Sequence, residues 1–186
     1  MENSRPNIVR LYRERLNLLL DVTQTINEKH SVDDLMQEFE TLLREELGVE
    51  RVIVYTRGEG KWNQILACGV TQRQADAIDP ERDLQGITKI ENLALTERER
   101  LLIFDAVIPL YHEFKLMGYV LVGDKGEGDG ISPTLRNLKY IQILANLIIV
   151  FIENKKMQMS LLKQESLKHE FEIATEIQRS LVPKDS

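Results

Sequence analysis

The residues that could carry out chemistry in this chain are one cysteine and three histidines. Cys68 could act as a nucleophile with His112 as its base, because a reactive thiolate needs a neighbouring proton acceptor. However, Cys68 lies in the apolar run Ile-Leu-Ala-Cys-Gly, a context typical of a buried structural cysteine. The other two histidines, His30 and His169, lie far apart, and their spacing fits no metal site. We therefore predict no catalytic residue in this chain.

A second candidate is the loop in which Asp124, Glu127 and Asp129 alternate with glycines. Calcium takes about six to eight oxygen ligands, so a calcium loop ends in a closing glutamate at its twelfth position. Counted from Asp124, the twelfth residue is Leu135, so the pattern fails. No glycine-rich phosphate loop follows a predicted strand either. The sequence thus predicts no metal site.

The composition excludes several classes of protein. Among 186 residues, 24 are Lys or Arg and 30 are Asp or Glu, which gives a net charge of −6. Without a basic surplus, nucleic acid is not an expected partner. The most apolar stretch, 141–152, is shorter than the roughly 20 residues of a membrane-spanning helix, so we expect no membrane segment. The single cysteine excludes an internal disulfide, and we expect a soluble cytoplasmic protein.

The first part of the chain predicts two amphipathic helices. Apolar residues recur every three or four positions between 8 and 27, which indicates a helix with an apolar stripe. A second helix is predicted to begin at Ser31, where Asp34 completes a capping-box pattern, and to end at Gly48.

The pattern then changes to that of strands. Residues 49–55 and 62–67 are rich in β-branched and aromatic residues on either side of a glycine-containing turn, which predicts a hairpin. Residues 71–100 are polar and predict one short helix beginning at Thr96.

Residues 102–124 predict a second pair of strands, joined by a polar turn at 112–115. Pro109 is expected at an edge or a bulge, because proline donates no hydrogen bond to a neighbouring strand. Ser132 followed by Pro133 then predicts the start of the last helix. Together these elements predict an α+β domain whose central antiparallel sheet is flanked by N-terminal helices and a long C-terminal helix.

The last helix is predicted to be long, since neither proline nor glycine occurs from 134 to 181. A heptad stripe along it indicates pairing with a second copy in a homodimer. The stripe changes register near 163–167, where we expect a stutter or bend with two competing packings. The predicted dimer seam consists of Ile141, Ala145, Ile148, Ile152, Met159 and Leu162.

This order of elements resembles a GAF domain. The late strand pair, Val107-Ile-Pro-Leu-Tyr-His and Gly118-Tyr-Val-Leu-Val-Gly, is similar to that family, and the likeness covers about residues 20–155. The resemblance implies a GAF-like fold in a chain of three parts. These are an N-terminal helix at 1–30, a sensor domain at 31–152 and a signalling helix at 153–186.

The GAF resemblance also implies where a small molecule would bind. Pockets in that family lie on the sheet face away from the terminal helices, which here places Tyr55, Cys68 and Tyr119 beside residues 71–100. The Asn-Lys-Phe-Asp-Glu set of cyclic-nucleotide-binding members is not found here, and bilin-binding members need a suitably placed cysteine. No cofactor is therefore assigned. The alternative that these three residues pack in the core stays open.

A second resemblance covers 171–183, Phe-Glu-Ile-Ala-Thr-Glu-Ile-Gln-Arg-Ser-Leu-Val-Pro. It is similar to the A-x-E-I-Q-x-x-L-x-P linker of metal-dependent PPM-type Ser/Thr phosphatases in bacterial sporulation and stress responses, with Val182 where leucine is commoner. The matching residues are Ala174, Glu176, Ile177, Gln178, Leu181 and Pro183. The resemblance implies that a phosphatase domain follows, and that this chain regulates the enzyme without being it.

These patterns together predict a regulatory sensor module that dimerises and passes a signal along its last helix to a downstream phosphatase. Two alternatives stay open. One is a dimerisation scaffold without a ligand. The other is a GAF-type methionine sulfoxide reductase, which a single cysteine disfavours because no resolving disulfide can form.

Overall fold

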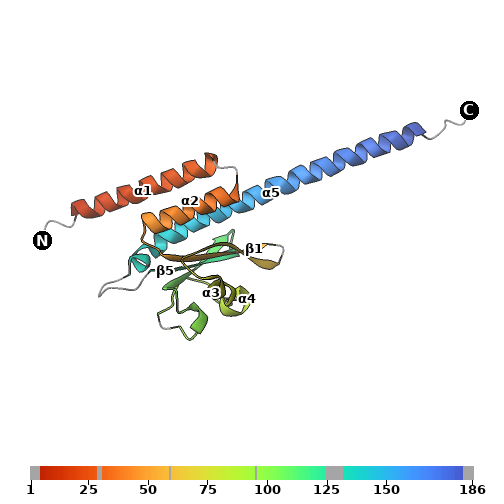
Figure 1. Ribbon diagram of the computed structural model, residues 1–186. Coiled ribbons are helices and arrows are strands. Elements are labelled where there is room, and N and C mark those ends of the chain that lie inside the picture. Colours follow the sequence, from red (N-terminus) through yellow and green to blue (C-terminus); the bar gives the residue numbers. More distant parts are fainter. Residues whose placement is uncertain (1–4, 29–30, 59, 95, 125–131, 182–186) are drawn as a thin grey trace, which may run out of the picture. The chain divides into compact units, whose positions relative to one another are not determined.

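The computed structural model describes residues 5–28, 31–58, 60–94, 96–124 and 132–181 (Figure 1). The chain divides into two compact units, Met1–Val150 and Phe151–Ser186, and the boundary lies inside the last helix. The elements in chain order are α1 (Arg5–Glu28), α2 (Val32–Glu45), β1 (Arg51–Gly58), β2 (Lys61–Cys68), α3 (Gln72–Asp76), α4 (Pro80–Asp83), β3 (Glu91–Asn92), the 3-10 helix η1 (Glu99–Leu101), β4 (Ala106–His112), β5 (Lys115–Gly123) and α5 (Pro133–Leu181).

The centre of the first unit is a five-stranded antiparallel sheet with the strand order β2-β1-β5-β4-β3. Both predicted hairpins are present, since β1 pairs with β2 and β4 pairs with β5. α2 and the first turns of α5 cover one face of the sheet, while α3 and α4 lie on the other face (Figure 1). The predicted fold class, α+β with a central antiparallel sheet and a long C-terminal helix, is confirmed.

Local signals set the ends of several elements as predicted. The Ser31 hydroxyl accepts a hydrogen bond from the Asp34 amide at 3.1 Å at the start of α2, and the chain turns after this helix through Gly48 at a φ of 67°. The turn between β4 and β5 is tight, because Glu113 and Phe114 have φ angles of 47° and 64°. Positive φ at both central residues is typical of a two-residue hairpin loop.

Pro109 lies at an open edge of the sheet, as its missing amide hydrogen predicts. β3 pairs with β4 only at Ala106 and Val107, so Pro109 has no strand neighbour on that side among the described residues. The register of β4 against β5 also shifts just beyond it, between Leu110 and Tyr111. The predicted edge position is therefore confirmed.

Residues 71–100 fold differently from the prediction of one short helix at Thr96. They contain α3, α4 and β3, and only the 3-10 turn η1 follows Thr96. Thr71 caps α3 in a capping box, and Asp79 caps α4 by accepting from the Glu81 amide at 3.0 Å. These caps are visible in the sequence, but helices of five and four residues have too little periodicity to be recognised.

The start of α5 is tied to the sheet by hydrogen bonds. The Ser132 hydroxyl accepts from the Leu135 amide at 3.3 Å, which agrees with the predicted helix start. The same hydroxyl donates to the Asp124 carboxylate just after β5, and that carboxylate also accepts from the Thr134 amide at 3.4 Å. A carboxylate is favourable there because the first amides of a helix carry partial positive charge. This cluster fixes where α5 leaves the sheet.

α5 is one helix from Pro133 to Leu181, so the predicted change of register near 163–167 is not a break in the helix. By length and composition alone, this helix is also long and apolar enough to cross a membrane. Its most apolar stretch of 18 residues has a mean hydropathy of 1.5, and 39% of that stretch is buried inside the protein. A buried core helix passes the same test, and Ile141 and Leu144 of α5 are fully buried. The absence of a membrane segment therefore stays a prediction.

Gly69, just after β2, provides a test of the tight packing between β2 and the start of β1. Its φ is 69°, and a Cβ atom there would lie 1.8 Å from the backbone carbonyl oxygen of Glu50. We expect Gly69→Ala to lower the free energy of unfolding by more than about 3 kcal/mol, because a backbone clash adds to the cost of positive φ.

Gly86→Ala is the matched control for this substitution. Gly86 has a φ of 83°, but no atom lies within 4 Å of the position that an added Cβ would take, so only the conformational cost of about 1–2 kcal/mol applies. Urea unfolding followed by Trp62 fluorescence measures both variants. Equal losses of stability would contradict the close approach at Gly69.

Candidate functional site

Two of the three predicted ligand residues, Tyr55 and Tyr119, lie directly opposite each other on β1 and β5. Both are buried, on the sheet face that carries α3 and α4. The Tyr55 hydroxyl donates to the carbonyl of Ala75 at 3.5 Å, and the Tyr119 hydroxyl donates to that of Ile87 at 3.2 Å. Burial raises the pKa of Tyr55 to about 12, because a phenolate would lose its hydration. The two neutral hydroxyls therefore tie the 71–100 segment to the sheet.

Buried side chains pack between this sheet face and the 71–100 segment. Trp62 covers its edge: the Trp62 ring lies 5.4 Å from that of Tyr119, and its indole nitrogen donates to Glu81 at 2.6 Å. Arg57 lies over the Trp62 ring at 5.5 Å. The other buried residues of this layer are Ile53, Ala75, Ile78, Leu84, Ile87, Leu93, Leu101, Phe104, Val107 and Leu121. The predicted ligand position is thus a packed apolar layer.

Cys68 lies apart from the two tyrosines, on the opposite face of the sheet. It pairs with Val52 at the end of β2, and its thiol donates to the Glu40 carboxylate of α2 at 2.8 Å. The Arg44 guanidinium donates to the same sulfur at 3.6 Å. Burial and the Glu40 carboxylate raise the pKa of the Cys68 thiol, which disfavours the nucleophilic thiolate. The three predicted ligand residues therefore do not form one site.

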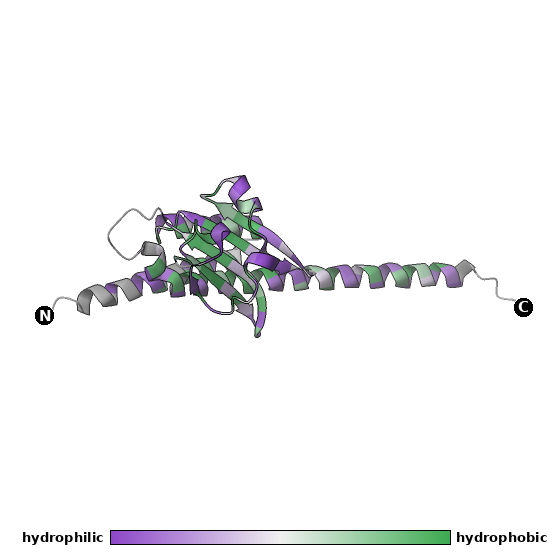
Figure 2. Ribbon diagram, turned by 90° about the horizontal axis from the view of Figure 1, so that it is seen from below, coloured by the Kyte–Doolittle hydropathy of each residue, from purple (hydrophilic) through white to green (hydrophobic). Residues whose placement is uncertain are grey.

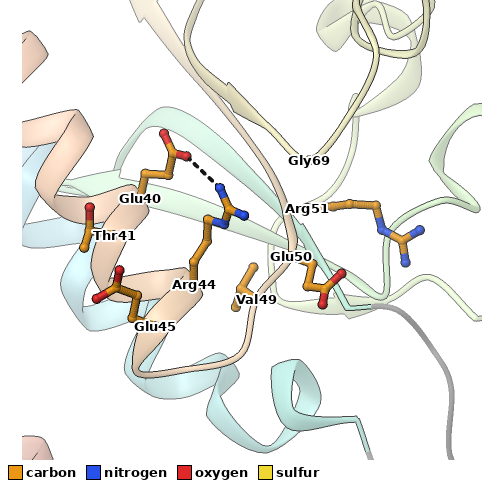
Figure 3. Close-up of a pocket in the computed structure, with 8 residues that line it drawn as sticks. All are labelled: Glu40, Thr41, Arg44, Glu45, Val49, Glu50, Arg51 and Gly69. Atoms are coloured by element: carbon orange, nitrogen blue, oxygen red, sulfur yellow. Dashed lines mark hydrogen bonds and ion pairs between the residues drawn. The ribbon is translucent and has the colours of Figure 1, made fainter.

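A groove of about 750 Å³ lies between α2 and the start of β1, near Cys68 (Figure 3). It is lined by Glu40, Thr41, Arg44, Glu45, Val49, Glu50, Arg51 and Gly69. Glu40 and Arg44 form an ion pair at 3.5 Å, and Arg51 points away from α2 in Figure 3. In sequence this groove is marked only by an i,i+4 charge pair, which is common on exposed helices.

The groove has no clear preference for a ligand. Its lining contains carboxylates and guanidinium groups in similar number, so neither sign of charge dominates. Over the described ranges of the chain, no three His, Cys, Asp or Glu side chains are grouped as metal ligands. We therefore assign no catalytic or metal-binding chemistry to it.

The structure buries the first part of the predicted dimer seam within the single chain. Four of its side chains are at most 3% exposed: Ile141, Ala145, Ile148 and Ile152. The other two, Met159 and Leu162, are 67% and 61% exposed. The four buried side chains are already covered before any partner binds, which corrects their assignment as a contact surface. An apolar stripe has the same spacing whether a sheet or a second helix covers it.

In the first unit, the side of α5 opposite its buried residues is exposed. α1 lies beside the start of α5. The Arg15 guanidinium of α1 donates to the Asn137 side chain at 2.7 Å, and the Tyr140 hydroxyl donates to the Arg15 carbonyl at 2.9 Å. Among the described side chains of α1 and of α5 up to Val150, the large apolar ones that are exposed are Leu16, Leu20, Ile143 and Leu147. They offer a surface that a second chain could cover.

The second unit, the far part of α5, exposes every side chain from 156 to 174. Figure 2 shows hydrophobic and hydrophilic residues interleaved along this helix. Its exposed large apolar side chains are Met157, Met159, Leu161, Leu162, Leu167, Phe171, Ile173 and Ile177. Of the predicted linker motif, Ala174, Glu176, Ile177 and Gln178 are exposed on α5, whereas the Leu181 side chain and Pro183 lie outside the described residues.

Comparison with solved structures shows the fold. The GAF domain of a proposed sensor histidine kinase from Pseudomonas syringae pv. tomato matches with a TM-score of 0.64 and 14% identity, over 86% of this chain and 99% of that one. The GAF domain of an Acinetobacter phosphoenolpyruvate-protein phosphotransferase matches with a TM-score of 0.55 and 18% identity, over 83% and 97%. A methyl-accepting chemotaxis protein, residues 122 to 287, matches with a TM-score of 0.53 and 14% identity, over 76% and 99%.

The fold is therefore GAF-like, as the order of elements in the sequence predicts. No protein-family model matches the sequence, and no curated protein matches it. At these low identities the structural likeness carries the fold alone, so the linker resemblance to PPM-type phosphatases stays a prediction.

Removing the Tyr119 hydroxyl tests how the 71–100 segment is held. The Ile87 carbonyl would lose a buried partner, so we expect Tyr119→Phe to lower the free energy of unfolding by about 1–2 kcal/mol. In the control Tyr111→Phe, the lost bond to the Thr88 carbonyl is exposed, and we expect less than about 0.5 kcal/mol. Urea unfolding measures the free energy of unfolding of both variants. Equal losses would contradict the conclusion that the buried hydrogen bond of Tyr119 holds the 71–100 segment.

Proposed function

We propose that this chain is the regulatory module of a cytoplasmic bacterial signalling protein. It dimerises and transmits a signal along α5 to a downstream PPM-type Ser/Thr phosphatase domain. The observation that carries this proposal is α5 itself, a single helix whose first turns are buried in the core and whose far part exposes a series of large apolar side chains. Such a helix connects a folded core to a surface that a partner must cover.

The hydrogen bonds at the start of α5 support transmission from the sheet to the helix. Asp105, just before β4, accepts from the Asp124 amide at 2.8 Å, and its carboxylate lies 3.4 Å from the Ser132 hydroxyl. The ends of two central strands and the first turn of α5 therefore share one network. A shift of the strands moves the helix start, and a two-state change in helix packing passes that shift onward.

The comparisons and the linker motif support the regulatory assignment from two directions. Two of the similar folds belong to proteins named for signalling, a proposed sensor histidine kinase and a methyl-accepting chemotaxis protein. The motif residues Ala174 and Gln178 lie on the exposed helix, where a linker to a following domain would need to be. The enzyme activity belongs to the downstream domain in this proposal.

A change in helix phase tests the proposed transmission in the full-length protein. Duplicating residues 155–156 turns the rest of α5 by about 200°, whereas duplicating residues 155–161 turns it by about 20°. We expect the two-residue duplication to change the phosphatase activity on a phosphoserine peptide and the seven-residue duplication to preserve it. Equal activities of the two variants, or a gene without a phosphatase domain after Ser186, would overturn the proposal.

A ligand-free dimerisation scaffold is the second candidate, and the packed layer over Tyr55 and Tyr119 favours it. In that case the GAF-like fold only holds two α5 helices in place. The methionine sulfoxide reductase alternative has less support, because the Cys68 thiol is paired with Glu40 and has a raised pKa. A reductase needs a thiolate that attacks the sulfoxide.

A thermal-shift screen with nucleotides and other small metabolites separates the sensor from the scaffold. A sensor should show a compound that raises the Tm, because a ligand stabilises the state it binds. The same compound should change the fluorescence of Trp62, which covers the edge of the apolar layer. For a scaffold we expect no compound with both effects.

A further inference from the structure

The far part of α5 carries an apolar stripe with no charged residue in it. Met157, Leu161, Leu167 and Phe171 lie on this stripe, with Gln164 between the middle two, at steps of three or four residues. Residues at that spacing lie along one side of a helix. The four apolar side chains are 55–74% exposed. We call this surface the uncharged stripe.

A rival stripe passes through Met159 and Leu162, the two exposed members of the predicted seam. Followed at the same spacing, it meets Lys155 in one direction and His169 in the other. Placing the Lys155 ammonium group between two packed helices costs free energy because the charge loses water. The uncharged stripe avoids this cost, so it is the better surface for helix pairing.

Amide side chains interrupt the uncharged stripe at Asn154, Gln164 and Gln178. In a parallel pair of helices in register, each amide faces its own copy, so its carbonyl accepts from the partner's NH2 group. Any shifted or antiparallel pairing sets at least one of these amides against an unlike side chain. An unpaired buried amide costs about 1–3 kcal/mol. The amides therefore select one direction and one register.

A second copy of α5 fits the stripe better than the other described helices do. From Asn154 to Gln178 the stripe extends along about 36 Å of helix. α2 has only 14 residues, and α1, with 24, is already held at the start of α5 through Arg15.

We propose that two copies of this chain pair through the uncharged stripe, in parallel and in register, with the three amides as matched polar layers. The inference rests on the proposed dimeric module and adds the face, direction and register of the contact. It places the contact on a different side of α5 from Met159 and Leu162.

Gln164 is the layer at which the spacing changes. Leu161, Gln164 and Leu167 follow at two successive three-residue steps, whereas a heptad pattern alternates steps of three and four. Such an irregularity overwinds a helix pair locally. The stripes on either side of Gln164 therefore favour different rotations of the two helices about their axes. The helix pair can change its packing at this layer.

Cysteine cross-linking in the full chain, with Cys68→Ser as background, tests the face and the direction. We expect Met157→Cys and Phe171→Cys each to form an interchain disulfide in a glutathione redox buffer, because an in-register pair brings identical positions within disulfide reach. Met159→Cys is the matched control, since Met159 and Met157 are 67% and 65% exposed but lie about 200° apart around the helix. We expect it to cross-link roughly tenfold less.

Sedimentation of the unmodified chain at micromolar concentration separates this inference from the proposed module. A monomer would overturn both. A dimer in which Met159→Cys cross-links as readily as Met157→Cys overturns the uncharged stripe alone. A dimer in which only one of Met157→Cys and Phe171→Cys cross-links overturns the parallel register.

A charge placed in the stripe gives an independent measurement that needs no new disulfide. We expect Gln164→Glu to weaken dimerisation by about tenfold or more, because two carboxylates would meet in one layer. Ser166→Glu adds the same charge on the other side of the helix, and we expect it to leave the dimer unchanged. Equal dissociation constants for the two variants would overturn the inference.

Discussion

The packing of α5 against the sheet is the contact on which the rest of this structure depends. Ile141, Leu144 and Ile148 are at most 2% exposed, and burial of one large aliphatic side chain contributes about 1.5–3 kcal/mol. Turning the helix about its axis would expose several of these side chains together. The Asp124–Ser132 hydrogen bonds hold the helix start at the same time. The side of α5 that stays exposed in the first unit is therefore set by the side that the sheet covers.

The sheet also divides the chemically interesting residues between two layers. Tyr55 and Tyr119 face the 71–100 segment and hold it through its backbone carbonyls, whereas Cys68 faces α2 and pairs with Glu40. In the proposed module, a signal that entered the 71–100 segment would reach α5 through the strands, since the tyrosines lie on β1 and β5 and β5 leads into Asp124. The GAF-like fold thus places the 71–100 segment and the first turns of α5 on opposite faces of one sheet.

Elements with strong local signals could be predicted from the sequence, and elements without them could not. The Ser31 cap, the Gly48 turn and the edge position of Pro109 each rest on the chemistry of one or two residues. The short helices α3 and α4 have capping residues but are too short to show a helical spacing of apolar residues. The sequence therefore predicts one short helix in the 71–100 segment and misses these two. The groove beside α2 joins residues from separate elements, and its only local signal is a common charge pair.

The sequence by itself determined the α+β order of elements, the acidic single-cysteine composition and the length of the last helix. Only the tertiary structure decided which residues meet. Cys68 is separated from Tyr55 because Cys68 pairs with Val52, and Val52 and Tyr55, three residues apart on β1, point to opposite faces of the sheet. Such a pairing depends on two strands together. The covered side of α5 was likewise decided by its partner, because apolar spacing along a helix does not distinguish a sheet from a second helix.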